Sequence, residues 1–249
     1  MFTQDDKCLK WCKDYIFSRY KLKDFSWEEE ISNEPKAIIF DIGHNTGDFT
    51  KIVFSILNEN IRVYAFEPNP YIESEYKNDE NVIIHSVALS EDESEATLFV
   101  PTKMKEEKSS SHLSSLFNRP TFNKLDNTYV QEVKVKVTNL DSFCFNNKID
   151  HIDYLKIDTE GYELEVFKGA KDLLKNKKIS CGQFEIGSIF EEKGNYLVSD
   201  IVKFLEQYGY SCYLGEMTNN NLLIHSSCIE IINKRSPDKW ENIIFSYNK

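Results

Sequence analysis

A strand–turn–helix–strand unit in residues 37–70 is the feature that most constrains what this chain can fold into. A short apolar run leads into the turn D-I-G-H-N-T-G, residues 41–47, and an amphipathic helix follows with apolar residues at helical spacing. A second apolar run, Val63–Phe66, ends at Glu67. In parallel sheets such a unit binds a nucleoside, because the glycine backbone and a helix N-terminus meet the ligand at the carboxyl ends of the strands. The unit therefore predicts a nucleoside-binding α/β fold.

The spacing of the glycines narrows the choice of nucleoside. A dinucleotide fingerprint reads G-x-G-x-x-G, whereas this turn reads D-x-G-x-x-x-G, with Asp41 ahead of Gly43. A carboxylate there would repel a pyrophosphate but suits the cationic amino-acid end of S-adenosylmethionine. The helix also lacks the G-K-[ST] signature of a phosphate-binding loop. Glu67 follows Gly47 by about 20 residues, close to the offset at which an acid reaches a ribose diol.

Length and terminal sequence bound the organisation of the chain. At 249 residues it fits one large α/β domain with additions. We expect an N-terminal helical extension at residues 1–34 and the main domain at residues 35–249. No apolar run approaches the ~20 residues that cross a bilayer, and the N-terminus lacks the apolar core of a secretory signal, so we expect a soluble, cytoplasmic protein. The N-terminal helices could form a homodimer interface or cover one face of the sheet.

Charge and cysteine content exclude some classes of function. Acidic residues outnumber basic ones by 41 to 30, a formal charge of −11. This excess disfavours general nucleic-acid binding, which relies on neutralising phosphates. The six cysteines include no C-x-x-C pair, so we expect reduced, buried thiols and no zinc site.

Strands and helices alternate along the chain, which predicts a mostly parallel sheet with helices on both faces. Residues 102–128 interrupt the pattern, because they are polar, serine-rich and without a sustained period. A segment this long inside an α/β domain is more often a lid or binding loop than a spacer, although disorder is an alternative. The further strands that we expect are 82–85, 96–100, 132–138, 152–157, 179–186 and several after 211, and the further helices are 163–167, 170–174 and 196–208.

The stretch D-Y-L-K-I-D-T-E-G-Y-E-L-E-V-F-K-G-A, residues 153–170, resembles the FkbM family of S-adenosylmethionine-dependent methyltransferases. Members typically carry D-x-K-x-D-x-E-G-x-E followed by G-A here, and this sequence supplies every element. The resemblance continues through F-D-I-G-H-N-T-G-D-F, A-F-E-P-N-P, H-S-V-A-L-S-E-D-E-S-E-A-T-L-F-V, S-S-L and V-T-N-L-D-S-F, and it covers residues 37–185. His44 departs from it, since Ala is usual at that place in the glycine turn.

The resemblance implies a fold, a cofactor and a set of binding residues. The fold is a Rossmann-like class I methyltransferase, an α/β architecture whose mostly parallel seven-stranded sheet has one antiparallel strand near its C-terminal edge. The implied cofactor is S-adenosylmethionine, and the known activities are largely O-methylation of sugars, glycolipids and macrolides. The implied cofactor-binding residues are Asp41, Gly43, His44, Asn45 and Gly47 in the turn, Glu67 on the ribose, Pro68 and Asn69 beside the adenosine, Val87 and Ala88 against the adenine, and Asp158 nearest the methyl group.

Methyl transfer to a sugar hydroxyl needs a group that removes the proton, since a hydroxyl is a poor acid. Asp158, Glu160 and Glu185 fall at or just beyond the expected carboxyl ends of strands, where open α/β sheets bind ligands. Asp158 is our first candidate for the base, and either glutamate could orient the acceptor. Helix capping is the competing role for Asp158 and Glu160, because D-T-E-G precedes a helix. His112, in the serine-rich loop, is an alternative base.

Several acceptors and activities remain open. Converging carboxylates are compatible with a divalent metal, but no His/Asp spacing fixes a site and we expect none. The favoured function is O-methylation of a hydroxyl on a sugar, sugar nucleotide or glycan, and O-methylation of another small molecule, such as a polyketide or lipid, is the nearest alternative. Asp41 and the missing third glycine disfavour a NAD-type oxidoreductase. The intact acidic positions disfavour a non-catalytic, cofactor-binding scaffold.

Overall fold

The computed structural model describes residues 37–57, 61–102, 113–117, 129–186, 197–218, 221–224 and 241–247. The extension predicted for residues 1–34, most of the predicted loop at 102–128, and His112 lie outside these ranges. Within the described part, strands and helices are interspersed up to α7 (Val198–Gln207), with five successive strands within residues 61–138, and the chain ends in strands. No helix in these ranges is long and apolar enough to span a membrane.

The main sheet has the order β10-β9-β11-β8-β7-β1-β2-β3. Its strands are β1 (Ala37–Ile42), β2 (Ile61–Phe66), β3 (Val82–His85), β7 (Ile152–Ile157), β8 (Ile179–Ile186), β9 (Tyr210–Thr218), β10 (Asn221–Ile224) and β11 (Glu241–Tyr247). The five strands from β3 to β8 are parallel, whereas β11 is antiparallel to both β8 and β9. This confirms the predicted mostly parallel sheet of seven strands with one antiparallel strand near its C-terminal edge. The short strand β10 pairs with β9 and adds an eighth strand at that edge.

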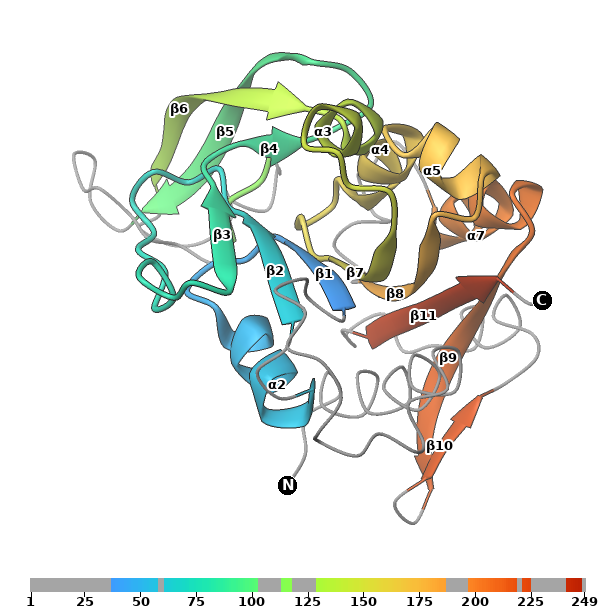
Figure 1. Ribbon diagram of the computed structural model, residues 1–249. Helices are drawn as coiled ribbons and strands as arrows, with labels where there is room; N and C mark the ends of the chain where they lie inside the picture. The colour runs from blue at the N-terminus through green and yellow to red at the C-terminus, as the bar shows by residue number, and fades with distance from the viewer. Residues whose placement is uncertain are drawn as a thin grey trace.

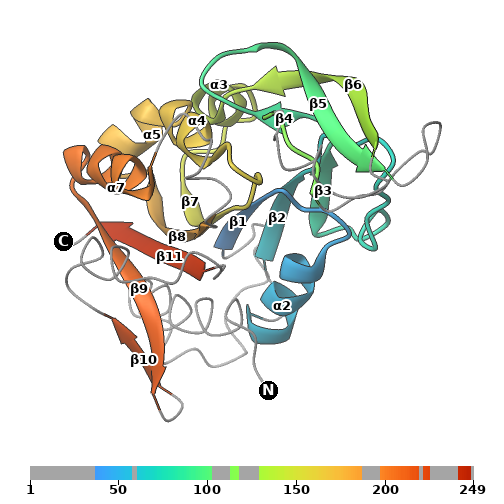
Figure 2. The ribbon, with the colours of Figure 1, turned by 180° about the vertical axis from the view of Figure 1, so that it is seen from behind.

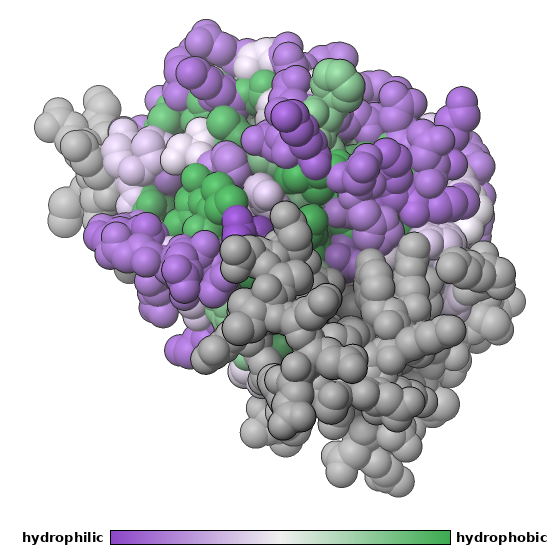
Figure 3. All heavy atoms as spheres, viewed as in Figure 1, coloured by the Kyte–Doolittle hydropathy of each residue, from purple (hydrophilic) through white to green (hydrophobic). Residues whose placement is uncertain are grey.

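Helices cover both faces of the sheet, as predicted. On one face, α2 (Asp48–Leu57) packs Phe49 and Val53 against Ile39 and Val63. On the other face lie α3 (Leu140–Asn146), α4 (Glu163–Lys168), α5 (Lys171–Lys175) and α7, which share a larger apolar cluster with the strands. Figures 1 and 2 show the sheet and the helices on its two faces from opposite sides of the molecule. The surface over α4, α5 and α7 is largely hydrophilic (Figure 3), as expected for helices that bury one apolar face.

A second, smaller sheet has the order β4-β6-β5. It is formed by β4 (Ala88–Leu89), β5 (Ser94–Thr102) and β6 (Tyr129–Thr138), and it has its own apolar cluster, which includes Leu98 and Val135. In both views it lies on the side of the molecule away from β9 and β10. β5 and β6 were predicted from the sequence, with shorter bounds, but β4 and the separation of these strands from the main sheet were not.

Candidate active site

A cavity of about 440 Å³ opens beside the carboxyl ends of β1, β2, β7 and β8. This is the place at which ligands bind in open α/β sheets, and the volume suits a small-molecule cofactor with part of an acceptor. Most of the residues predicted from the sequence line it: Gly43, His44, Asn45, Glu67, Pro68, Val87, Ala88, Asp158, Glu160 and Glu185. Asp41, Gly47 and Asn69 do not line it, and His112 lies outside the described residues.

The glycine turn is held against the ends of two strands. The amides of Gly43 and His44 both donate to the carbonyl of Phe66, at 3.0 and 3.1 Å, and the amide of Asp158 donates to Ile42 O at 3.0 Å. Gly43 has a φ of +76°, and a Cβ added to it would lie 1.7 Å from Asp158 O. Only glycine fits here, because the turn passes directly over the backbone at the end of β7.

Glu67 is fixed by backbone donors. Its Oε2 accepts from the amide of Asn45 at 2.9 Å, and its Oε1 accepts from the amide of Asn69 at 2.8 Å. Burial raises the pKa of Glu67, although these two amides oppose the shift. The carboxyl group thus stays at the rim of the cavity in one orientation, with lone pairs left for a ligand hydroxyl.

Asp41 lies behind the cavity wall and is fully buried. Its Oδ2 accepts from Thr50 Oγ1 at 3.0 Å and lies 2.8 Å from His44 Nδ1. Its Oδ1 accepts no hydrogen bond within the described residues and faces Lys156 Nζ at 3.3 Å. Burial would raise the pKa of Asp41, but Lys156, His44 and Thr50 together hold it at about 2. Asp41 is therefore an anion that acts on the cavity through its neighbours.

His44 ties the glycine turn to the segment after β2. Its Nε2 lies 2.7 Å from Ser74 Oγ, which also accepts from the amide of Tyr76 at 3.0 Å. Nδ1 donates to the Asp41 carboxylate, since a carboxylate can only accept, and Nε2 shares a hydrogen bond with the Ser74 hydroxyl. Gly47 is covered by this segment, since a Cβ added to it would lie 2.7 Å from the ring of Tyr76. The histidine that replaces the usual Ala is thus integrated into the turn.

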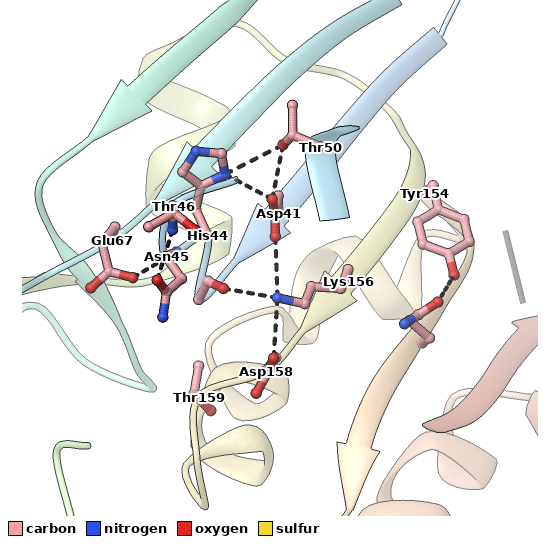
Figure 4. Close-up of polar contacts among 12 residues, drawn as sticks. Asp41, His44, Asn45, Thr46, Thr50, Glu67, Tyr154, Lys156, Asp158 and Thr159 are labelled. Carbon is pink, nitrogen blue, oxygen red and sulfur yellow. Dashed lines mark hydrogen bonds and ion pairs between the residues drawn. The ribbon is translucent and has the colours of Figure 1, made fainter. Parts of the chain in front are cut away.

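Lys156 is a site residue that the sequence analysis missed. It lies on β7, every residue of which is buried, and it is the cross-strand partner of Asp41 on β1. Figure 4 shows its ammonium group between Asp41 and Asp158. The available signal was a lysine inside the strand I-D-Y-L-K-I, which is apolar apart from Asp153 and Lys156, because a buried lysine needs charged or polar partners.

Three acidic side chains, Asp158, Glu160 and Glu185, converge at one end of the cavity. Oxygen atoms of Asp158, Glu160 and Glu185 all lie within 4.8 Å of one another. Burial of Glu185, together with the negative charge of Asp158 and a hydrogen bond to it, raises the pKa of Glu185. Glu185 therefore keeps its proton at neutral pH and shares it with Asp158. The three side chains are also placed so that they could hold a metal ion.

The D-T-E-G turn is organised by another acid, Glu163. Its Oε1 accepts from the amides of Thr159 and Gly161, at 3.0 and 3.1 Å, and from Thr159 Oγ1 at 2.9 Å. The N-cap of α4 is Tyr162, and no side chain caps the helix there. Helix capping, the competing role for Asp158 and Glu160, is therefore not what the structure shows.

The described part of the predicted loop, residues 113–117, reaches both ends of the site. Ser115 pairs with Phe99 of β5, and its Oγ donates to the carbonyl of Glu160 at 3.0 Å. Ser114 Oγ accepts from Asn69 Nδ2 at 3.0 Å. Residues 113–116 line the cavity. Asn69 also lines a second cavity of about 360 Å³, which adjoins the first at Asn45 and Glu67.

These features fit S-adenosylmethionine. Glu67 can accept from a ribose diol, and Val87, Ala88 and Leu89 form an apolar wall for an adenine ring. Asp41 lies behind the cavity wall, and Lys156 balances its charge at 3.3 Å, so Asp41 acts on a bound ligand only through its neighbours.

Comparison with known families gives a match to the methyltransferase FkbM domain over residues 41–212, more than half of the chain. The chain belongs to the FkbM methyltransferase family. It is therefore a methyltransferase, and S-adenosylmethionine is its cofactor. The FkbM match spans both the glycine turn and the D-T-E-G turn.

Solved structures similar to this FkbM methyltransferase are distant in sequence. Precorrin-6y C5,15-methyltransferase from Geobacter metallireducens is 12% identical, with 87% of this chain and 82% of that chain covered and a TM-score of 0.43. The plantazolicin methyltransferase BpumL, solved with S-adenosylhomocysteine, is 10% identical, with 98% and 85% covered and a TM-score of 0.40. No match was found among curated proteins. The assignment rests on the family match.

Proposed function

We propose that this enzyme is an O-methyltransferase that acts on a hydroxyl of a sugar, sugar nucleotide or glycan. The observation that carries the proposal is the group of three carboxylates, Asp158, Glu160 and Glu185, at one end of the cofactor cavity. Carboxylates accept hydrogen bonds from the hydroxyls of a carbohydrate, and one of them can remove the proton that a hydroxyl loses when it is methylated.

The residues divide the work between binding and proton transfer. When bound, S-adenosylmethionine supplies a methyl group on a positively charged sulfur, which an oxygen nucleophile displaces in line. Glu67 and the glycine turn hold the nucleoside and amino-acid ends of the cofactor. Asp158, directly after β7, takes the hydroxyl proton as the new carbon–oxygen bond forms. Glu185 and Glu160 orient the acceptor beside it.

The acceptor class is tested by transfer of labelled methyl groups from S-adenosylmethionine to a panel of free sugars, sugar nucleotides, glycans, lipids and polyketides. The proposal expects label in an ether of a carbohydrate that survives mild base, which would hydrolyse a methyl ester. Label confined to lipids or polyketides would refute the acceptor class, and label on nitrogen or carbon would refute O-methylation.

Replacement of Asp158 by Asn tests the base. We expect Asp158→Asn to lower the rate of methyl transfer by about 10²–10⁴-fold, the usual contribution of a general base. Affinity for S-adenosylhomocysteine should stay within a few-fold, because the amide keeps the shape of the side chain. Calorimetry and single-turnover rates measure the two quantities separately. A rate close to that of the wild type would remove Asp158 as the base.

A further inference from the structure

Lys156 lies between the glycine turn and Asp158, one of the three acidic residues at the end of the cavity. A lysine ammonium has three N–H donors, and three oxygens surround this one: Gly43 O at 2.8 Å, Asp41 Oδ1 at 3.3 Å and Asp158 Oδ2 at 3.4 Å. The side chain is buried, and the Phe49 ring centre lies 5.8 Å from Nζ. One positive charge thus serves both the buried carboxylate of Asp41 and the partly exposed carboxylate of Asp158.

The charges around this ammonium are mostly negative. Five acidic side chains are among the described residues that line the cavity: Asp48, Glu67, Asp158, Glu160 and Glu185, of which Glu185 holds a proton. Lys156 is the one lysine or arginine in that described lining. At an effective dielectric constant of about 20, charges at such sites interact by kilocalories rather than tenths. The charge of Lys156 therefore sets much of the field that a cationic ligand meets.

The cofactor and its product differ in charge at the sulfur. S-adenosylmethionine carries a sulfonium, whereas the sulfur of S-adenosylhomocysteine is neutral, and the remaining groups are the same. The ratio of the two dissociation constants therefore reports the electrostatic field near the sulfur. A residue that only supports the fold alters both constants alike and leaves their ratio unchanged.

We propose that Lys156 is a positioning residue that holds Asp158 and balances its charge, and thereby limits how strongly the cavity prefers the cationic cofactor over its neutral product. The inference rests on the proposed function, because it takes Asp158 to lie near the transferred methyl group. The sulfonium loses its charge as the methyl group leaves. Without the positive charge of Lys156, the carboxylates would stabilise the bound sulfonium more than the transition state, in which its charge is being lost, and the reaction would be slower.

The experiment is calorimetric titration of the full chain with each ligand. In Lys156→Gln the amide still donates to Gly43 O but the charge is gone. We expect the Kd of S-adenosylhomocysteine divided by that of S-adenosylmethionine to rise on the order of tenfold, about 1.4 kcal/mol. Lys156→Arg keeps the charge and should keep the wild-type ratio. Lys178→Gln, a matched control that removes a lysine paired with Asp150, should also keep it.

Lys156→Gln leaves Asp41 buried without its counter-charge, which can prevent folding. A second pair of variants avoids this problem. In Asp41→Asn the buried side chain is neutral and needs no counter-charge. Adding Lys156→Gln to this variant then removes only the charge of Lys156. The same rise in the ratio is expected between these two variants. An unchanged ratio in either comparison would overturn the inference and leave Lys156 a counter-ion for Asp41. A wild-type protein that binds neither ligand would overturn the proposed function as well.

Discussion

At the scale of single residues, the site depends on how closely the glycine turn approaches the end of β7. Gly43 provides the contact, since its backbone passes over the carbonyl of Asp158 and its φ is positive. This approach brings the Gly43 carbonyl to Lys156 and, through Lys156, to Asp41. The first glycine of the motif is thus needed for packing between strands as well as for ligand access.

Gly43→Ala should therefore damage both fold and binding. The added Cβ would lie 1.7 Å from Asp158 O, so the turn or the strand end must move. We expect a loss of about 3 kcal/mol or more in the free energy of unfolding, from overpacking added to the cost of positive φ. Urea unfolding and titration with S-adenosylhomocysteine measure the two effects.

Gly209→Ala is the matched control for Gly43→Ala. Gly209 also has a positive φ, +71°, but the nearest atom to an added Cβ is the mobile end of Lys177. It should cost about 1–2 kcal/mol, the conformational penalty alone, and leave binding intact. Equal losses for the two variants would show that the contact with Asp158 is unimportant.

Sequence patterns predicted some of the residues of the site but not others. The acid–glycine pattern located the turn, Glu67 and the D-T-E-G acids, because each follows a strand in the sequence. Lys156 and Glu163 were not predicted as site residues, since their roles depend on contacts across strands and around a turn. His44 was predicted as a cofactor residue, but its link to Ser74 depends on a segment 30 residues away.

At the scale of elements, residues 113–117 join the small sheet to the site. Ser115 is buried, pairs with Phe99 of β5, and donates to Glu160 O. Glu160 itself has a φ of +58°. The serine therefore helps to hold the D-T-E-G turn in the conformation that directs the Glu160 carboxylate into the cavity.

Ser115→Ala tests this link. The hydroxyl donates to Glu160 O and accepts from the amide of Phe117 at 3.1 Å, so its removal takes a partner from each of these backbone groups. We expect the free energy of unfolding to fall by about 1–3 kcal/mol, as for a lost buried partner. Ser55→Ala, which removes an exposed hydroxyl bonded to Ile52 O, should cost under about 0.5 kcal/mol. Similar losses in denaturant unfolding would argue against the link.

Periodicity predicted most elements but not how they assemble. β8 was predicted with its observed bounds, because apolar residues recur through Ile179–Ile186 as in a strand. The small sheet was not predicted, since β5 and β6 show the same alternation whether they pair with each other or with the main sheet. The placement of β11 between β8 and β9 likewise depends on tertiary packing and was not predicted; the family resemblance implied only an antiparallel strand near that edge.

At the scale of the whole molecule, stability should depend on pH through Glu185. Its folded-state pKa is raised above the ordinary 4.5, so above about pH 4.5 the folded protein holds a proton that the unfolded chain has lost. Where the folded state binds more protons, the free energy of unfolding falls as pH rises. The protonated Glu185 therefore has a cost, because it makes the folded protein less stable as the pH rises above about 4.5.

Glu185→Gln should relieve that cost, because the amide stays neutral and can still donate to Asp158. At pH 8 the variant should be more stable than the wild type by at least about 1 kcal/mol, and the difference should shrink toward pH 5. Denaturant unfolding at several pH values measures it. Glu95→Gln, at an exposed site on β5, provides the baseline. A Glu185→Gln variant no more stable than the wild type at pH 8 would show that Glu185 is ionised there.

Every step of the proposed reaction depends on S-adenosylmethionine binding in the cavity at the ends of β1, β2, β7 and β8. Calorimetric titration with S-adenosylhomocysteine, with NAD as the comparison, tests this binding. We expect S-adenosylhomocysteine to bind at micromolar Kd, about −8 kcal/mol, and NAD not to bind. Binding of NAD alone, or of neither ligand, would show that the cavity is not a site for S-adenosylmethionine.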